Sequence, residues 1–180
     1  LALIREAEQR QVCQLLGVNN VEFLRYPDGT LQNNLELRKS IVRLIRKYKP
    51  TAVITENPTA RWVGNYVNHP DHRAIGDATM DAVFPSARDI HMFPELIAEE
   101  GLGAHIVEHL YLGMIGDQAN VFIDISDTIE TKIAALRGHK SQMRDPTTKF
   151  DDEIRFMATR EDQLGNPSYL ETFRYFYLGS

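Results

Sequence analysis

Cysteine, tryptophan and long apolar runs are scarce in this sequence. There is one cysteine, Cys13, so an internal disulfide and a disulfide-stabilised scaffold are excluded. This composition suits a reducing compartment, and we expect a cytoplasmic protein. No run of about 18 apolar residues occurs, so we expect no membrane span. No signal peptide is visible either.

A net positive charge and two common enzyme motifs are also lacking. The net charge is −5, which argues against nucleic-acid binding as the main function. The sequence has no Gly-x-Gly-x-x-Gly, so nothing supports a nucleotide-binding Rossmann domain. It has no Gly-x-Ser-x-Gly, which disfavours a serine hydrolase.

The sequence does contain alternating helix and strand patterns. Its 180 residues are 43% hydrophobic and 25% charged, enough for one ordinary domain over 1–180 with a real core. Hydrophobic periodicity predicts helices at 1–16, 35–48, after His72 and at 151–163, and strands at 21–24, 52–55, 106–112 and 120–125. The alternation predicts an α/β fold, a three-layer sandwich with a mostly parallel central sheet.

Three local patterns carry further expectations. The strand at 52–55 is apolar without alternation, so we expect it to be buried on both faces. Asp127 and Glu130 are spaced as a capping box that opens a helix through about Arg137. The aromatic residues between Tyr169 and Tyr177 are expected to clamp the C-terminal segment onto the body.

The stretch from Asn68 to His72 is rich in groups that carry chemistry. Pro70 suits the first position of a helix and pushes the residue before it out of the helical region. We therefore expect an extended His69 at or near the N-cap, with Asp71 and His72 in the first turn, at the positive end of the helix dipole. One imidazole can then bind a metal, while the other, oriented by Asp71, handles a proton or polarises a carbonyl.

A structural role is the alternative for the same segment. A His-Pro-Asp-His string can be a surface loop with an N-capping histidine and a solvated aspartate. The motif also supplies too few ligands for a metal by itself, because a catalytic zinc takes about three protein ligands plus water. Any metal site here needs partners from elsewhere.

Segments spread over most of the chain carry a family resemblance. They are Arg5-x-x-Glu8 with Leu16-Gly17-Val18, Phe23-Leu24-x-Tyr26-Pro27-Asp28-Gly29, Lys49-Pro50, Asn68-His69-Pro70-Asp71-His72, the strand with Asp124, and His139-x-Ser141-Gln142. In this order and spacing they resemble the LmbE-like, or PIG-L, deacetylases. The resemblance implies a zinc-dependent N-acetylglucosaminyl de-N-acetylase with a Rossmann-like fold.

The resemblance also implies roles for the matching residues of the helix start. His72 would be the third zinc ligand. His69 would stabilise the tetrahedral oxyanion or help to protonate the leaving amine, with Asp71 setting its tautomer. The cofactor would be zinc, which activates water and polarises the carbonyl of the amide.

Substrate contacts are implied elsewhere. Arg5 and Asp28 would contact the sugar or its substituent, and Asn68 would donate a hydrogen bond from the pocket wall. The partner implied is a small amino-sugar conjugate, not a nucleic acid or a membrane. The oligomeric state stays open, a homo-oligomer included.

One family motif, His-Pro-Asp-Asp-Glu, does not occur in the sequence. In the family it ends the first strand and supplies a histidine and an aspartate to zinc and another aspartate as general base. We expect the chain to begin downstream of that strand, so that its domain is N-terminally incomplete. Two functions stay open: a zinc-dependent hydrolase that removes acetyl from an N-acetylglucosamine-type conjugate by metal-activated water, and a catalytically inactive α/β domain that binds a sugar or a protein partner.

Overall fold

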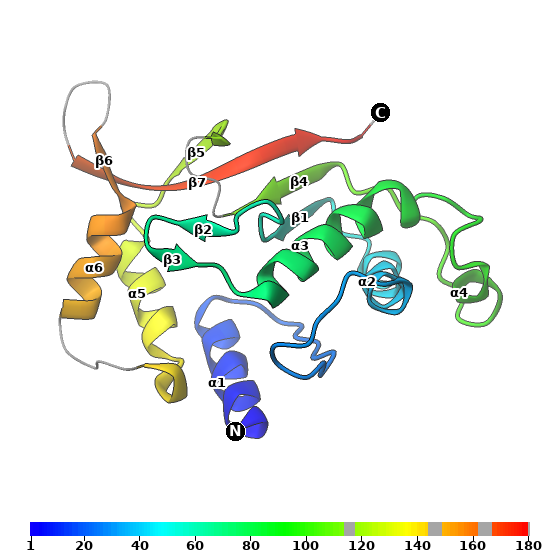
Figure 1. Cartoon of the computed structure of the whole chain (residues 1–180), viewed down its shortest axis with the longest axis horizontal. Coiled ribbons are helices and arrows are strands. Elements are labelled where there is room, and N and C mark those ends of the chain that lie inside the picture. Colours follow the sequence, from blue (N-terminus) through cyan, green and yellow to red (C-terminus); the bar gives the residue numbers. More distant parts are fainter. Residues whose placement is uncertain (114–117, 144–148, 162–166, 180) are drawn as a thin grey trace. The chain divides into compact units, whose positions relative to one another are not determined.

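The computed structural model describes residues 1–113, 118–143, 149–161 and 167–179, which fall into two compact units (Figure 1). The smaller unit comprises Leu1–Leu24 and Phe122–Glu171, and the larger comprises Arg25–Val121 and Thr172–Ser180. Within the described residues, no helix combines the length and apolar character that a membrane crossing requires.

The larger unit is a mixed sheet packed against helices. Its elements are α2 (Leu35–Tyr48), β1 (Ala52–Thr55), β2 (Trp62–Val63), β3 (Tyr66–Val67), α3 (Pro70–Asp81), the π-helical turn η1 (Ala82–Ser86), α4 (Pro94–Ala98), β4 (His109–Leu112) and the second half of β7 (Pro167–Tyr177). β1 pairs with β4 in parallel, β4 pairs with β7 antiparallel, and β2 and β3 form a separate hairpin (Figure 1).

Helix α2 has the bounds that its sequence predicts. The side chain of Asn34 accepts the N–H of Leu37 at the start, and Lys49 ends the helix in the left-handed conformation at φ 49°. The apolar face of α2 joins the core of the larger unit with α3, η1 and β4. The buried members of that core are Leu37, Ile41, Val42, Ile45, Ala78, Ala82, Val83, Ala87, Leu96, Val107, Leu110 and Leu112.

The loop after β1 runs directly over α3, at Gly76. A Cβ on Gly76 would lie 2.5 Å from the backbone oxygen of Glu56 and 3.0 Å from the nitrogen of Pro58. Only glycine leaves room for this approach. The contact holds the loop that ends at Asn68 against the helix that begins with Pro70.

The smaller unit consists of helices, two strands and the first part of β7. Its elements are α1 (Ala2–Leu15), β5 (Val121–Asp124), α5 (Ile129–Arg137), the 3₁₀ turn η3 (Lys140–Gln142), α6 (Lys149–Ala158) and β6 (Thr159–Glu161). β6 pairs antiparallel with β7, with Thr159 opposite Tyr169. The predicted helix at 1–16 is confirmed as α1, which ends at Leu15 with Leu16 at its C-cap and is followed by Gly17 at φ +71°.

Two predictions about strands are wrong. Residues 21–24 form no strand; Phe23 instead lies under the guanidinium of Arg10, 5.0 Å from its ring centroid. No strand is predicted between residues 55 and 106, yet residues 62–67 form the β2–β3 hairpin. Its turn is Gly64-Asn65, with Gly64 at φ +56°, and a glycine-asparagine pair is a recognisable hairpin signal.

The predicted sheet is also corrected. The strand at 52–55 exists as β1, but its residues alternate between exposed and half-buried, and Ile54 is 68% exposed. Alternation follows because Val53 faces the core while its neighbours face away from it. In the part of the chain that the structure describes, the sheet has one parallel pair, β1 with β4, and is mixed, because β7 enters it antiparallel. The expected mostly parallel sheet is therefore wrong.

The C-terminal third differs in three further details. The aromatic segment is the long strand β7, whose half-buried Phe176 packs against the core of the larger unit. The capping box is absent: α5 begins at Ile129 with Thr128 at its N-cap and no side-chain cap, while Glu130 pairs with Arg155. The predicted helix at 151–163 is α6, which ends at Ala158 and is followed by β6; residues 162–163 lie outside the described part.

Candidate active site

The candidate site is the start of α3, in the larger unit. His69 is the N-cap residue, with an extended backbone at φ −58° and ψ 139°, and Pro70 opens the helix. The expected positions of His69, Asp71 and His72 around this helix start are confirmed. The rings of His69 and His72 lie side by side, with centroids 5.7 Å apart and planes inclined by 52°.

Asp71 joins the helix start to a turn that precedes it by some forty residues. Its two carboxylate oxygens accept the backbone N–H groups of Gly29, at 2.7 Å, and Leu31, at 3.1 Å, across separations of 42 and 40 residues. The carboxylate is 3.9 Å from Nδ1 of His69. Its short hydrogen bonds therefore go to the turn.

The same turn brings Asp28 to His69. An oxygen of Asp28 lies 3.9 Å from Nε2 of His69, in an arrangement open to solvent, since the Asp28 side chain is 75% exposed. Nδ1 of His69 accepts the N–H of Asp71 at 3.3 Å. A neutral ring that accepts at Nδ1 carries its proton on Nε2, so His69 presents an N–H donor on the side of Asp28.

His72 has the opposite arrangement. Its Nδ1 lies 3.0 Å from Oδ1 of Asn68, which is an acceptor, so Nδ1 carries the proton and Nε2 keeps a lone pair. A metal-binding histidine characteristically donates its second N–H to a carbonyl or carboxylate in this way. His72 therefore fits a zinc ligand.

A second group of possible ligands is the trio Asp28, His69 and Asp71. One ligand atom of each lies within 4.8 Å of the others. The chemistry of the trio fits a metal less well, because His69 uses Nδ1 as an acceptor and carries a proton on Nε2. Asp71 already accepts two backbone N–H groups. The trio is better suited to holding a proton donor in place than to holding an ion.

The structure distributes the six residues singled out from the sequence between the two units. Asp28, Asn68, His69, Asp71 and His72 lie in the larger unit, around the start of α3. Arg5 lies on α1, in the smaller unit. Gly29 and Leu31, which contribute backbone N–H groups, were not predicted as site residues from the sequence. Their turn was recognisable, but nothing local pointed to Asp71 as its partner.

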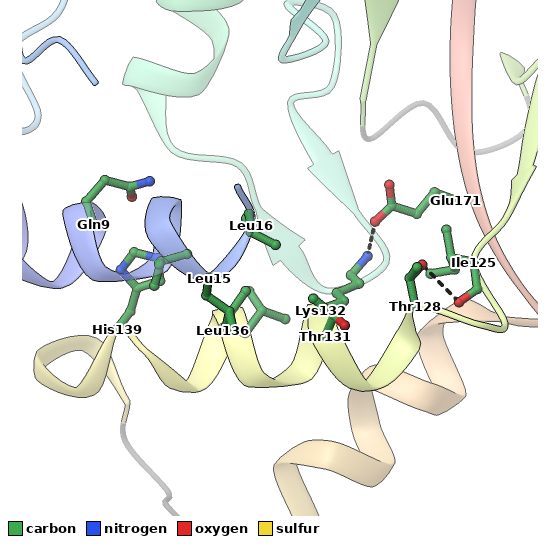
Figure 2. Close-up of a pocket in the computed structure, with 12 residues that line it drawn as sticks. Gln9, Leu15, Leu16, Ile125, Thr128, Thr131, Lys132, Leu136, His139 and Glu171 are labelled. Carbon is green, nitrogen blue, oxygen red and sulfur yellow. Dashed lines mark hydrogen bonds and ion pairs between the residues drawn. The ribbon is translucent and has the colours of Figure 1, made fainter. Parts of the chain in front are cut away.

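A separate pocket of about 640 Å³ lies within the smaller unit, between α1 and α5. Figure 2 shows Leu15, Leu16 and Leu136 along its wall and the ammonium group of Lys132 directed at the carboxylate of Glu171. None of the six residues lines it. We therefore do not assign the catalytic site to this pocket. We assign it to the start of α3, because of the geometry of the side chains there.

Comparison with known proteins points to one group of enzymes. Residues 1–83 match the family model described as PIG-L, GlcNAc-PI de-N-acetylase. The chain is 32% identical over 176 residues to the diacetylchitobiose deacetylase of Thermococcus kodakarensis, covering 97% of this chain and 63% of that protein. It is 28% identical over 155 residues to the probable N-acetyl-α-D-glucosaminyl L-malate deacetylase 2 of Bacillus anthracis, covering 85% and 62%.

A solved structure agrees. The N,N′-diacetylchitobiose deacetylase from Pyrococcus horikoshii, complexed with its inhibitor MPG, superposes with a TM-score of 0.82 at 27% identity. The match covers 98% of this chain and 64% of that one. The chain thus spans less than two thirds of the length of each of these three relatives.

Proposed function

Because the chain belongs to the PIG-L family of de-N-acetylases, we propose that it is part of a zinc-dependent hydrolase that removes an acetyl group from an N-acetylglucosamine-type conjugate. The observation that carries the proposal is the pair of neighbouring imidazoles at the start of α3. His69 offers an N–H donor, while His72 offers a lone pair. Amide hydrolysis at a metal needs both kinds of group. The Rossmann-like, three-layer architecture of the complete enzyme is part of the same proposal.

In this proposal His72 holds the ion through Nε2. When bound, zinc supplies Lewis acidity, which activates water and polarises the amide carbonyl. His72 is one ligand of the three that a catalytic zinc takes. In the family the His-Pro-Asp-Asp-Glu motif supplies the others, and that motif does not occur in the sequence.

His69 acts on the substrate. Its Nε2–H donates a hydrogen bond to the carbonyl oxygen as negative charge develops there. The alternative role, proton transfer to the departing amine, requires an imidazolium, in which Nδ1 is also protonated and no longer accepts the N–H of Asp71. A donor of this kind stabilises the transition state by about 3 kcal/mol. Asp71 holds the turn of Asp28 beside that donor. Asp28 is the proposed contact to the sugar, and the contact expected for Arg5 stays a prediction from the sequence. The substrate is a small amino-sugar conjugate.

The competing function is a catalytically inactive domain that binds a sugar or a protein partner. Its support is the absence of the His-Pro-Asp-Asp-Glu motif from the sequence. A domain of that kind binds an N-acetylated sugar without releasing acetate.

The experiment is to follow acetate release from N,N′-diacetylchitobiose by the full-length protein loaded with zinc. We expect turnover that a chelator abolishes and zinc restores. His69→Ala should keep its zinc and lose turnover by roughly 10²–10³-fold. His91→Ala, an exposed histidine after η1, is the matched control and should behave as the wild type. Binding without acetate release would favour the inactive domain, and full activity in His69→Ala would contradict the proposed role of that residue.

A further inference from the structure

We propose that Asn68 is a positioning residue that sets the tautomer of His72 and thereby directs a lone pair on Nε2 toward a metal ion. The inference rests on the proposed function, because it deepens the role of the same site. It assigns to Asn68 a task inside the protein, one step removed from the substrate.

Asn68 is fixed at every polar group. It is 1% exposed, its backbone N–H donates to the carbonyl of Arg61 at 2.9 Å, and its own carbonyl accepts Nη1 of Arg73 at 2.6 Å. Its side chain contacts Ala60 and His72. A buried amide held in this way has no alternative partner to turn to.

The contact to Ala60 determines which way the amide faces. The carbonyl of Ala60, 2.8 Å away, can only accept a hydrogen bond, so the amide atom that faces it must be the NH₂ group. The oxygen of Asn68 then faces Nδ1 of His72, 3.0 Å away. An oxygen there requires a proton on Nδ1. The chain of partners from Ala60 through Asn68 to His72 thus leaves the neutral ring with its lone pair on Nε2.

The two neighbouring rings therefore carry their protons on different nitrogens, for different reasons. His69 accepts the N–H of Asp71 at Nδ1 and carries its proton on Nε2. His72 donates from Nδ1 to Asn68. The exchange of one tautomer for the other would move the lone pair of His72 from Nε2 to Nδ1, which faces Asn68. Asn68 keeps the proton of His72 on Nδ1, so that His72 offers a lone pair while His69 offers an N–H donor.

The tautomer can be read directly, in the absence of metal, from the ¹⁵N chemical shifts of His72 in the 180-residue chain. At a pH where the ring is neutral, we expect a protonated Nδ1 and an unprotonated Nε2. Asn68→Asp keeps an oxygen toward Nδ1 and should keep this pattern. Asn68→Leu removes it and should move the proton toward Nε2, the form preferred by histidine in water.

A matched control is Asn57→Leu. Asn57 is another buried amide of the same loop, and its side chain accepts from Thr59. That variant should leave the ¹⁵N pattern of His72 unchanged. The wild-type spectrum decides the matter even if a leucine variant fails to fold: a proton on Nε2 of His72 in the wild type would overturn the proposal.

Zinc affinity of the full-length protein gives a second readout. Loss of a partner that orients a metal-binding histidine typically weakens metal binding by about 10–100-fold. Asn68→Leu should show a loss of that size, with Asn68→Asp closer to the wild type. Equal zinc affinity in Asn68→Leu and the wild type would overturn the role toward the ion. A protonated Nδ1 in a protein that releases no acetate would instead leave the tautomer assignment standing and count against the proposed hydrolase.

Discussion

The carboxylate of Asp71 accepts the backbone N–H of Gly29 at 2.7 Å, and this bond ties the first turn of α3 to the turn that carries Asp28. A second bond, from the N–H of Leu31, uses the other oxygen. Two residues of the candidate site, Asp28 and His69, are thus held together through a third. The site depends on this connection before any substrate or ion is bound.

Asp71→Asn tests the connection. An amide replaces one acceptor oxygen with an NH₂ group that faces a backbone N–H, so one hydrogen bond is lost and a repulsive contact replaces it. We expect the free energy of unfolding to fall by about 1–3 kcal/mol and the amides of Gly29 and Leu31 to exchange faster with solvent. Asp77→Asn, at an exposed position of the same helix, should change stability by less than about 0.5 kcal/mol. Equal effects of the two substitutions would contradict the connection.

Within the smaller unit, the side chain of Glu8 is hydrogen-bonded to Ser141. Its carboxylate accepts the hydroxyl of Ser141 at 2.7 Å and the N–H of Ser141 at 2.8 Å, which lower the pKa of Glu8 from 4.5. A carboxyl group whose pKa is lowered on folding stabilises the folded state at pH values above its unfolded-state pKa. That stabilisation is lost as the pH falls through the lower, folded-state pKa. Ser141→Ala should therefore raise the pKa of Glu8 and reduce the loss of stability between neutral pH and acid.

The control for this prediction is a similar pair in the same unit. The pKa of Asp124 is lowered by hydrogen bonds from Ser126. Ser126→Ala should raise the pKa of Asp124 and leave that of Glu8 in place, and Ser141→Ala should do the reverse. Carboxyl titration followed by NMR measures both. An unchanged pKa of Glu8 in Ser141→Ala would show that the hydrogen bond from the Ser141 hydroxyl to Glu8 does not form.

Gly76→Ala tests the close approach of the loop to α3. A helical alanine is favoured over glycine by about 1 kcal/mol, but the new methyl would lie 2.5 Å from the backbone oxygen of Glu56. Overpacking of this kind costs about 1–3 kcal/mol, so we expect a net loss of stability in urea unfolding. Gly103→Ala, where the methyl would meet nothing within 4 Å, should be close to neutral. A gain of stability in Gly76→Ala would place the loop away from the helix.

Local signals in the sequence predicted the elements that depend on them. Helix α2 follows from its apolar periodicity, and the start of α3 follows from Pro70. The family resemblance rested on ordered motifs such as His69-Pro70-Asp71-His72, and the comparisons bear it out. Features that a few adjacent residues determine could be read without coordinates.

Pairing between distant segments could not be read in the same way. The aromatic residues of β7 suit a packed tail as well as a strand, and its antiparallel pairing with β4, which makes the sheet mixed, depends on residues more than sixty positions away. The partners of Asp71 lie 42 and 40 residues away. For Asn68, the sequence suggested a hydrogen-bond donor at the wall of a pocket. Its burial and its contacts with Ala60 and His72 became visible only in the folded chain.

The zinc content of the full-length protein tests the central proposal most directly. The wild type should hold about one zinc per chain, His69→Ala should hold as much, and His72→Ala should hold far less, because it lacks a ligand. Elemental analysis of the three purified proteins gives the comparison. If His72→Ala and the wild type contained the same amount of zinc, His72 would not be a ligand, and the proposed metal site at the start of α3 would be wrong.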